Sequence, residues 1–226
     1  NAALATYLHE RAEAPADLRQ KPTFLYIPNP VAACFPDTAA FDWLAEWSTS
    51  VSSLNDEAHA CIENMAEETA DVAPFSLDAM TAAHDAGSAA APDRRIPFYQ
   101  RGMFQDSMRA RAPQLSTLLD SAPLARIPNY APNAEILVLQ PGAGTATLRG
   151  RTNAFCTVVT AFAGSAPLKV TVGGESRQLV AGRALVFDSS FGFDYAAGDA
   201  PVCALVLEVW NPGILHLERD ALTALI

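Results

Sequence analysis

The residues best suited to metal or nucleophilic chemistry are scattered widely along this chain. Its four cysteines include no CxxC pair of the kind that builds a zinc site, so we interpret them as buried free thiols. No histidine accompanies a nucleophile motif, and no glycine-rich phosphate loop stands out. Nucleophilic hydrolysis therefore has no support in the sequence. The histidines are His9, His59, His84 and His216, and the cysteines are Cys34, Cys61, Cys156 and Cys203.

The composition excludes two classes of partner. The formal charge is −10 and the 15 Lys and Arg residues are dispersed, which argues against a nucleic-acid or anionic-membrane surface. No apolar run approaches the roughly 20 residues that span a bilayer. We expect a soluble protein, with the cytoplasm slightly favoured, and a first residue other than Met indicates a trimmed or processed chain.

The length of 226 residues and the hydrophobic content of 50% predict one compact domain, 1–226. Apolar residues at helical spacing predict a helix over residues 1–14 and one or two helices within residues 37–68. Residues 71–95 are rich in Ala, Gly, Pro and Asp and predict a loop, and a further helix is expected over residues 108–122. Residues 1–125 thus form a mainly helical layer and loop.

From residue 134 the sequence changes to short β-branched runs separated by turns. The pair Gly173 and Gly174 predicts a hairpin, since glycine adopts the positive φ that such a turn needs. Short strands after a helical front end predict a mainly β fold, a jelly roll backed by helices, with its core in residues 126–213 and a tail in 214–226. The runs are 134–140, 154–162, 168–174, 175–182, 183–190 and 203–210.

Several motifs, in this order, resemble the aspartyl/asparaginyl β-hydroxylase family of Fe(II)/2-oxoglutarate dioxygenases. The resemblance implies a double-stranded β-helix of the cupin-like kind. It also implies which positions would hold iron and the co-substrate. The motifs are FLYIPNPVAACFPDTAAFDWL (24–44), RIPNYAPNAEILVLQPG (126–142), GRTN (150–153), VGGESRQLVAGRALVFDSSF (172–191) and EVWNPG (208–213).

The family's functional residues do not carry over. Its two iron-binding histidines align with Leu148 and Phe193, and neither side chain can coordinate a metal. The Arg and His that hold 2-oxoglutarate align with Thr157 and Val159, and a later Arg falls near Val202 or Cys203. We therefore expect no metal, no cofactor and no Fe(II)/2-oxoglutarate oxygenase activity. A dianionic co-substrate would be buried there without a charge partner.

Strand alternation predicts that the former active site has become an apolar, aromatic-lined cavity. One alternative is that these side chains simply fill the core. A disulfide between Cys156 and Cys203 is a further option, although their predicted faces differ. The predicted substrate-binding residues are Leu148, Phe155, Thr157, Val159, Phe193, Tyr195 and Cys203.

The sequence leaves three functions open. The first is a metal-free enzyme, a cyclase or isomerase, that binds a hydrophobic small molecule. The second is a non-catalytic binding or regulatory protein whose acidic helical face meets a protein partner. The third is a β-hydroxylase with relocated iron ligands, drawn from the four histidines, Asp188 and Asp194. Asp188 is expected to hydrogen-bond backbone within the FDSS turn.

Overall fold

A computed structural model describes residues 17–28, 32–65 and 94–226. The helix predicted over residues 1–14 and most of the loop predicted over 71–95 lie outside these residues, as do His9 and His84. No helix in the described part is long and apolar enough to cross a membrane.

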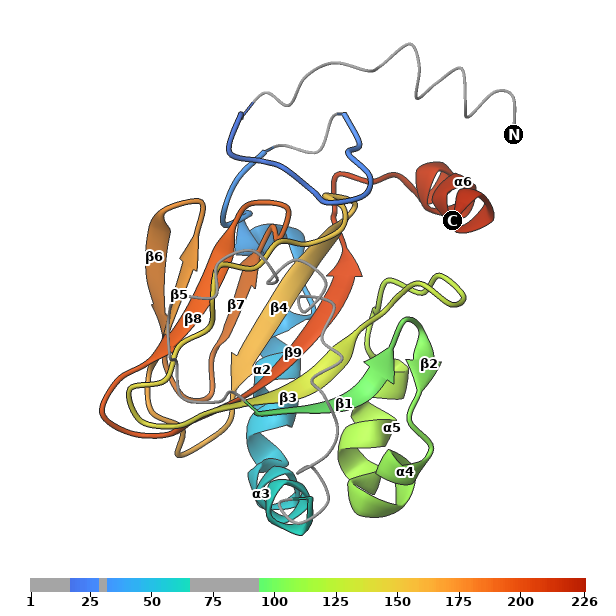
Figure 1. The fold of residues 1–226 in the computed structure, drawn as a ribbon. Helices are drawn as coiled ribbons and strands as arrows, with labels where there is room; N and C mark the ends of the chain where they lie inside the picture. The colour runs from blue at the N-terminus through green and yellow to red at the C-terminus, as the bar shows by residue number, and fades with distance from the viewer. Residues whose placement is uncertain (1–16, 29–31, 66–93) are drawn as a thin grey trace.

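Two antiparallel sheets form the body of the protein (Figure 1). The larger sheet has the strand order β2-β1-β3-β9-β4-β7, and the smaller has the order β6-β5-β8. The predicted hairpin turn is confirmed between β5 and β6, where Gly173 and Gly174 have φ of 57° and 88°. The strands are β1 (Arg94–Gln100), β2 (Met103–Phe104), β3 (Ala134–Leu139), β4 (Phe155–Ala161), β5 (Leu168–Val172), β6 (Glu175–Leu179), β7 (Ala184–Phe187), β8 (Phe193–Ala197) and β9 (Val202–Trp210).

The chain passes back and forth between the sheets. After β3 in the larger sheet, the segment 143–149 lies along β8 of the smaller sheet, with bridges from Gly144 to Ala196 and from Leu148 to Phe193. The chain then returns to the larger sheet as β4, and β7, β8 and β9 alternate between the sheets in the same way. This winding is that of a double-stranded β-helix, so the predicted jelly-roll fold is confirmed.

Helices cover the outer face of the larger sheet (Figure 1). The helix predicted over 108–122 is two helices, because Pro113 starts a new helix and forces Ala112 out of the helical conformation, to φ −144° and ψ 70°. The predicted tail contains a helix, α6. The helices are a short 3-10 turn η1 (Thr38–Ala40), α2 (Leu44–Ser53), α3 (Asn55–Asn64), α4 (Ser107–Arg111), α5 (Pro113–Ser121) and α6 (His216–Leu225).

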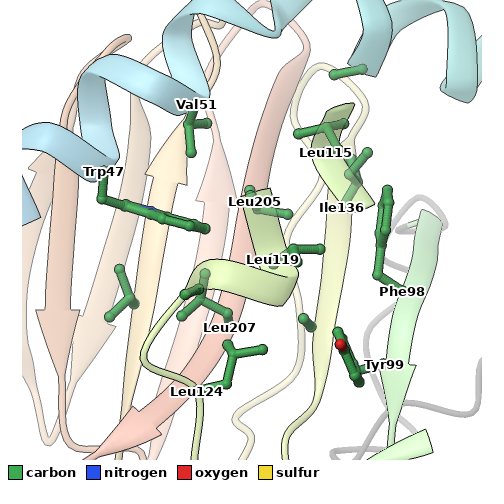
Figure 2. Close-up of a cluster of buried hydrophobic side chains, with 14 of the residues drawn as sticks. Trp47, Val51, Phe98, Tyr99, Leu115, Leu119, Leu124, Ile136, Leu205 and Leu207 are labelled. Atoms are coloured by element: carbon green, nitrogen blue, oxygen red, sulfur yellow. The ribbon is translucent and has the colours of Figure 1, made fainter. Parts of the chain in front are cut away.

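A hydrophobic cluster, here called the helix-facing cluster, joins these helices to the larger sheet (Figure 2). Trp47 and Val51 of α2 and Leu115 and Leu119 of α5 pack over Leu205 and neighbouring strand residues. The Trp47 indole Nε1 donates a hydrogen bond of 2.9 Å to the Thr160 hydroxyl, so the one polar atom of the ring is satisfied. This layer fixes the larger sheet from behind and leaves its other face to the site.

The strands β1 and β2 were not predicted. The run Arg94–Gln100 contains two arginines and Pro97, a composition that favours a loop. The structure accommodates Pro97 at an irregularity in the β1–β3 pairing, where the register shifts before Tyr99. Pairing with β3 therefore overrides the local composition.

Candidate functional site

Leu148 and Phe193 lie directly opposite each other at one end of the smaller sheet. The Leu148 N–H donates to the Phe193 carbonyl at 2.7 Å, and the Phe193 N–H donates to the Leu148 carbonyl at 2.9 Å. Both residues are buried, with exposed fractions of 5% and 3%. Directly opposed residues point their side chains to the same face of a sheet, here the space between the two sheets.

The structure brings four predicted site residues together in this space. Leu148, Val159, Phe193 and Tyr195 belong to one buried cluster, here called the interior cluster. The Phe193 ring lies 5.0 Å from the Phe187 ring and 5.6 Å from the Tyr195 ring, which are distances of favourable aromatic packing. Thr157 faces the same space, because it is two residues from Val159 on β4.

Phe155 and Cys203 lie outside the interior cluster. The Phe155 ring packs against Trp210 at 5.2 Å and Tyr130 at 6.2 Å, in an end cluster beside α6. Cys203 belongs to the helix-facing cluster, because its neighbours Val202 and Ala204 are the β9 residues that point into the interior.

The expectation that Cys156 and Cys203 have different faces is wrong. Both belong to the helix-facing cluster. Cys156 pairs with Val209, six positions from Cys203 along β9, so the two thiols are far apart although they share a face. All four cysteines are free, and burial raises the pKa of Cys203 to about 12.

Sequence reasoning missed charged residues on the interior face of the larger sheet. The Arg95 guanidinium donates to the Glu135 carboxylate at 2.6 Å, and their side chains are only 7% and 15% exposed. Ile96 and Ile136 face the helices, so Arg95 and Glu135 face the interior. The alternation in β3 was a usable signal for Glu135, whereas Arg95 lies in the unpredicted strand β1.

Glu208 is a further acidic group on this face, opposite Thr157 in the β4–β9 ladder. Its carboxylate accepts hydrogen bonds from the Asn133 backbone N–H at 2.8 Å and from the Asn133 side-chain amide at 2.7 Å. These bonds fix the carboxylate at the start of β3. The interior therefore has a polar edge beside its apolar centre.

Tyr130 adds a buried phenol near Glu208. It lies in the connection between α5 and β3, is 6% exposed, and carries the Arg151 guanidinium 4.0 Å from its ring centre. Burial is the main cause that raises the pKa of Tyr130 to about 12. The charge of Arg151 lowers this pKa and that of Glu208 raises it, both by smaller amounts. The phenol is therefore protonated at physiological pH.

Asp188 forms the expected turn and also binds the N-terminal segment. Its carboxylate accepts from the Ser190 backbone N–H at 2.9 Å, from the Ser190 hydroxyl at 2.6 Å, and from the Gln20 side-chain amide at 2.8 Å. Burial raises the pKa of this carboxyl to about 6, against the lowering effect of these hydrogen bonds.

The residues at the site do not fit an iron ion. The side chains of Leu148 and Phe193 have no lone pair, and iron in proteins takes imidazole, carboxylate or thiolate ligands. Within residues 17–28, 32–65 and 94–226, no three His, Cys, Asp or Glu side chains gather closely enough to hold a metal. His59 lies on α3, behind the larger sheet, and the His216 side chain is exposed on α6.

The fold and the site define a cupin-like domain, a double-stranded β-helix whose interior is apolar at its centre and charged at one edge. A sequence profile described as aspartyl/asparaginyl beta-hydroxylase matches residues 52–212. The chain belongs to this family.

Among curated proteins, no match was found. The chain is also similar to solved structures of low identity, some of which are described as cupin proteins. The cupin domain of an XRE family transcriptional regulator from Enterobacter cloacae is 14% identical, with a TM-score of 0.35, over 52% of this chain and 96% of that chain. A cupin-superfamily sugar phosphate isomerase from Silicibacter pomeroyi is 18% identical, with a TM-score of 0.28, over 34% and 50%. The DMSP lyase DddQ from Ruegeria pomeroyi is 19% identical, with a TM-score of 0.30, over 35% and 38%.

Proposed function

We propose that the protein is a metal-independent enzyme, of the cyclase or isomerase type, that acts on a hydrophobic small molecule between its two sheets. The pairing of Leu148 with Phe193 carries this proposal. The family resemblance aligns both residues with iron-binding histidines, and two ligands of one ion must be neighbours in space. That two hydrocarbon side chains meet at this point supports a site rebuilt for an apolar ligand.

The same reasoning applies to the co-substrate. A 2-oxoglutarate dianion needs a cationic partner in a buried site. Of the residues aligned with the family's co-substrate contacts, Thr157 and Val159 carry no charge. Arg95 reaches the interior face from β1, yet its guanidinium is paired with Glu135. This arrangement favours a neutral ligand over a dianion.

The apolar centre and polar edge suit a reaction that depends on positioning. A cyclisation or isomerisation conserves every atom of the substrate, so it needs no oxidant, reductant or second substrate. The interior cluster would exclude water and hold one folded conformer, and such positioning alone lowers a barrier substantially. Polar groups at the edge, such as Thr157 and the carboxylate of Glu208, would orient the ligand.

A second candidate is a non-catalytic binding or regulatory protein. The observation that favours it is the tight burial of the interior residues, since Val159 and Tyr195 are almost fully inaccessible. A filled interior would leave the outer surface as the only binding site. The third candidate, an oxygenase with relocated ligands, draws no support from His59 or His216, which lie on separate helices.

The first experiment measures iron content and 2-oxoglutarate affinity after anaerobic reconstitution with Fe(II). An intact family member serves as the positive control. We expect neither stoichiometric iron nor co-substrate binding. Tight one-to-one iron would contradict the metal-independent proposal and revive the relocated-ligand candidate.

A second experiment separates an enzyme from a regulator. The gene is deleted in the source organism, and hydrophobic metabolites are compared by exact mass and chromatography. A cyclase or isomerase predicts that one metabolite is replaced by an isomer of identical mass. A change by one oxygen atom would indicate an oxygenase, and altered abundances without a new isomer would indicate a regulator.

A further inference from the structure

The Tyr130 hydroxyl is a buried donor without a partner. Its oxygen is inaccessible to solvent, and no hydrogen-bond partner for it exists among the described residues. Buried polar groups in native proteins are nearly always hydrogen-bonded, so an unpaired phenol indicates a place where another molecule supplies the acceptor. A phenylalanine would fill this position without the free-energy cost of burying an unpaired hydroxyl.

The surroundings of Tyr130 hold the phenol in place. The Arg151 guanidinium lies over its ring at 4.0 Å and also lies 5.4 Å from the ring centre of Phe24. The Phe155 ring packs against Tyr130 from the end of β4 at 6.2 Å. Stacking against a cation and an aromatic ring fixes the ring plane, and thereby the direction of the hydroxyl.

Tyr130 belongs to the end cluster, and its neighbour Phe155 shares the interior-facing side of β4 with Thr157. Glu208, whose charge acts on the phenol, is the β9 partner of Thr157. Thr157 is in turn the β4 partner of Phe187, whose ring lies 5.0 Å from the Phe193 ring. Phe155, Glu208 and Thr157 thus connect the polar edge at Tyr130 with the interior face of the larger sheet.

We propose that the Tyr130 hydroxyl donates a hydrogen bond to a carbonyl oxygen of the ligand in the interior site. This inference rests on the proposed function and narrows the substrate class to hydrophobic ketones, aldehydes and their conjugated relatives. A neutral oxygen is favoured over a carboxylate, because the Tyr130 hydroxyl is buried and a full negative charge is costly to bury. The nearby positive charge of Arg151 favours the partial negative charge of a carbonyl oxygen.

The bond would also serve the reaction. Donation to a carbonyl oxygen withdraws electron density from the conjugated carbon atoms, which promotes bond migration or ring closure without adding or removing an atom. The proton stays on the phenol oxygen, since Tyr130 holds it far more tightly than a carbonyl does.

The test uses two fluorescent probes of nearly the same size and shape. One is the ketone dye propionyl-dimethylaminonaphthalene, whose emission moves to longer wavelength when its carbonyl accepts a hydrogen bond. The other is its propyl analogue, in which CH2 replaces C=O. For Tyr130→Phe we expect about ten-fold weaker binding of the ketone, with emission at shorter wavelength, and unchanged binding of the analogue.

The matched control is Tyr99→Phe. Tyr99 is also a buried tyrosine, in the helix-facing cluster (Figure 2), but its hydroxyl donates to Asp120 at 2.7 Å. We expect Tyr99→Phe to lower the melting temperature and leave both probes bound. Tyr130→Phe should not lower the melting temperature of the free protein, since it removes a hydroxyl that has no partner.

The outcomes separate this inference from the function on which it rests. Unchanged ketone binding by Tyr130→Phe, or an equal loss for both probes, would overturn the role of Tyr130 and leave the interior site standing. Failure of both probes to bind the wild-type protein would instead remove the interior ligand site, and with it the proposed function.

Discussion

Leu148 and Phe193 exchange both of their backbone hydrogen bonds, at 2.7 and 2.9 Å, across the bridge that joins segment 143–149 to β8. Such a pair places its Cα atoms about 5.5 Å apart with both side chains on one face. Two imidazoles at this spacing can bind one metal ion. The geometry of a two-histidine site is therefore present although the side chains are hydrocarbon.

We expect the double variant Leu148→His/Phe193→His to bind Co(II) or Zn(II) as a one-to-one complex. Each single variant should bind much more weakly, because one imidazole cannot chelate. Cobalt absorption bands and isothermal titration give the readout, with circular dichroism to verify folding. A folded double variant that takes up no metal would show that the two positions do not form a ligand pair.

Asp188 makes stability depend on pH in a defined direction. Its pKa is about 6 in the folded protein and about 3.8 when unfolded, so the folded state binds the proton more tightly. The resulting stabilisation is complete below pH of about 4 and is lost as pH rises to about 6. We expect wild-type stability to decrease across this window relative to Asp188→Asn, by up to a few kcal/mol.

The Asp188→Asn variant is a suitable reference because the site can keep its hydrogen bonds. The new amide can donate to the Gln20 side-chain oxygen, which has no partner among the described residues, once the Gln20 amide rotates. Its own oxygen remains available to Ser190. Urea unfolding at several pH values measures the difference in unfolding free energy between the two proteins. If this free energy depended on pH in the same way in both, the raised pKa of Asp188 would be refuted.

The buried pair Arg95–Glu135 should behave differently from an exposed pair. Removing one partner takes away the ion pair that offsets the burial of the other charge, so we expect Arg95→Met to cost about 3 kcal/mol of unfolding free energy. Arg95→Met/Glu135→Leu should recover most of that loss, since neither charge of the pair is then buried. The exposed pair Arg19–Glu175 supplies the control, because both side chains are more than half exposed, and Glu175→Gln should leave the unfolding free energy nearly unchanged. If the single and the double variant lost the same unfolding free energy, the loss in Arg95→Met would not come from burying the Glu135 charge without Arg95.

The fold was predictable because the segments from β3 onward are short β-branched runs separated by turn residues. The pairing of Leu148 with Phe193 depends on β-helix winding, which only the family resemblance indicated. The family resemblance left the late-strand position open between Val202 and Cys203, and the pairing of β9 with β3 and β4 turns Val202 to the interior and Cys203 to the helices. Tyr130 was not predicted as a site residue, because its role depends on an unpaired hydroxyl that only packing reveals.

Gly150, in the GRTN motif two residues after Leu148, should tolerate no side chain. A Cβ there would overlap the Ser189 hydroxyl and lie 2.9 Å from the Ser189 Cβ and 3.1 Å from its carbonyl carbon. The Gly150 N–H also donates to the Ser189 carbonyl at 2.6 Å, so the two backbones cannot separate without losing this bond. We expect Gly150→Ala to cost about 1–3 kcal/mol.

Gly198→Ala is the matched control for Gly150→Ala. Nothing lies within 4 Å of a Cβ at Gly198, and its φ is not in the left-handed region. This variant should be neutral or stabilise the protein by up to about 1 kcal/mol, through lower entropy of the unfolded chain. Because segment 143–149 carries Leu148, the strain of Gly150→Ala should also weaken binding of the apolar probe. If Gly150→Ala keeps the stability and the probe affinity of the wild-type protein, the contact between Gly150 and Ser189 does not hold segment 143–149 in place.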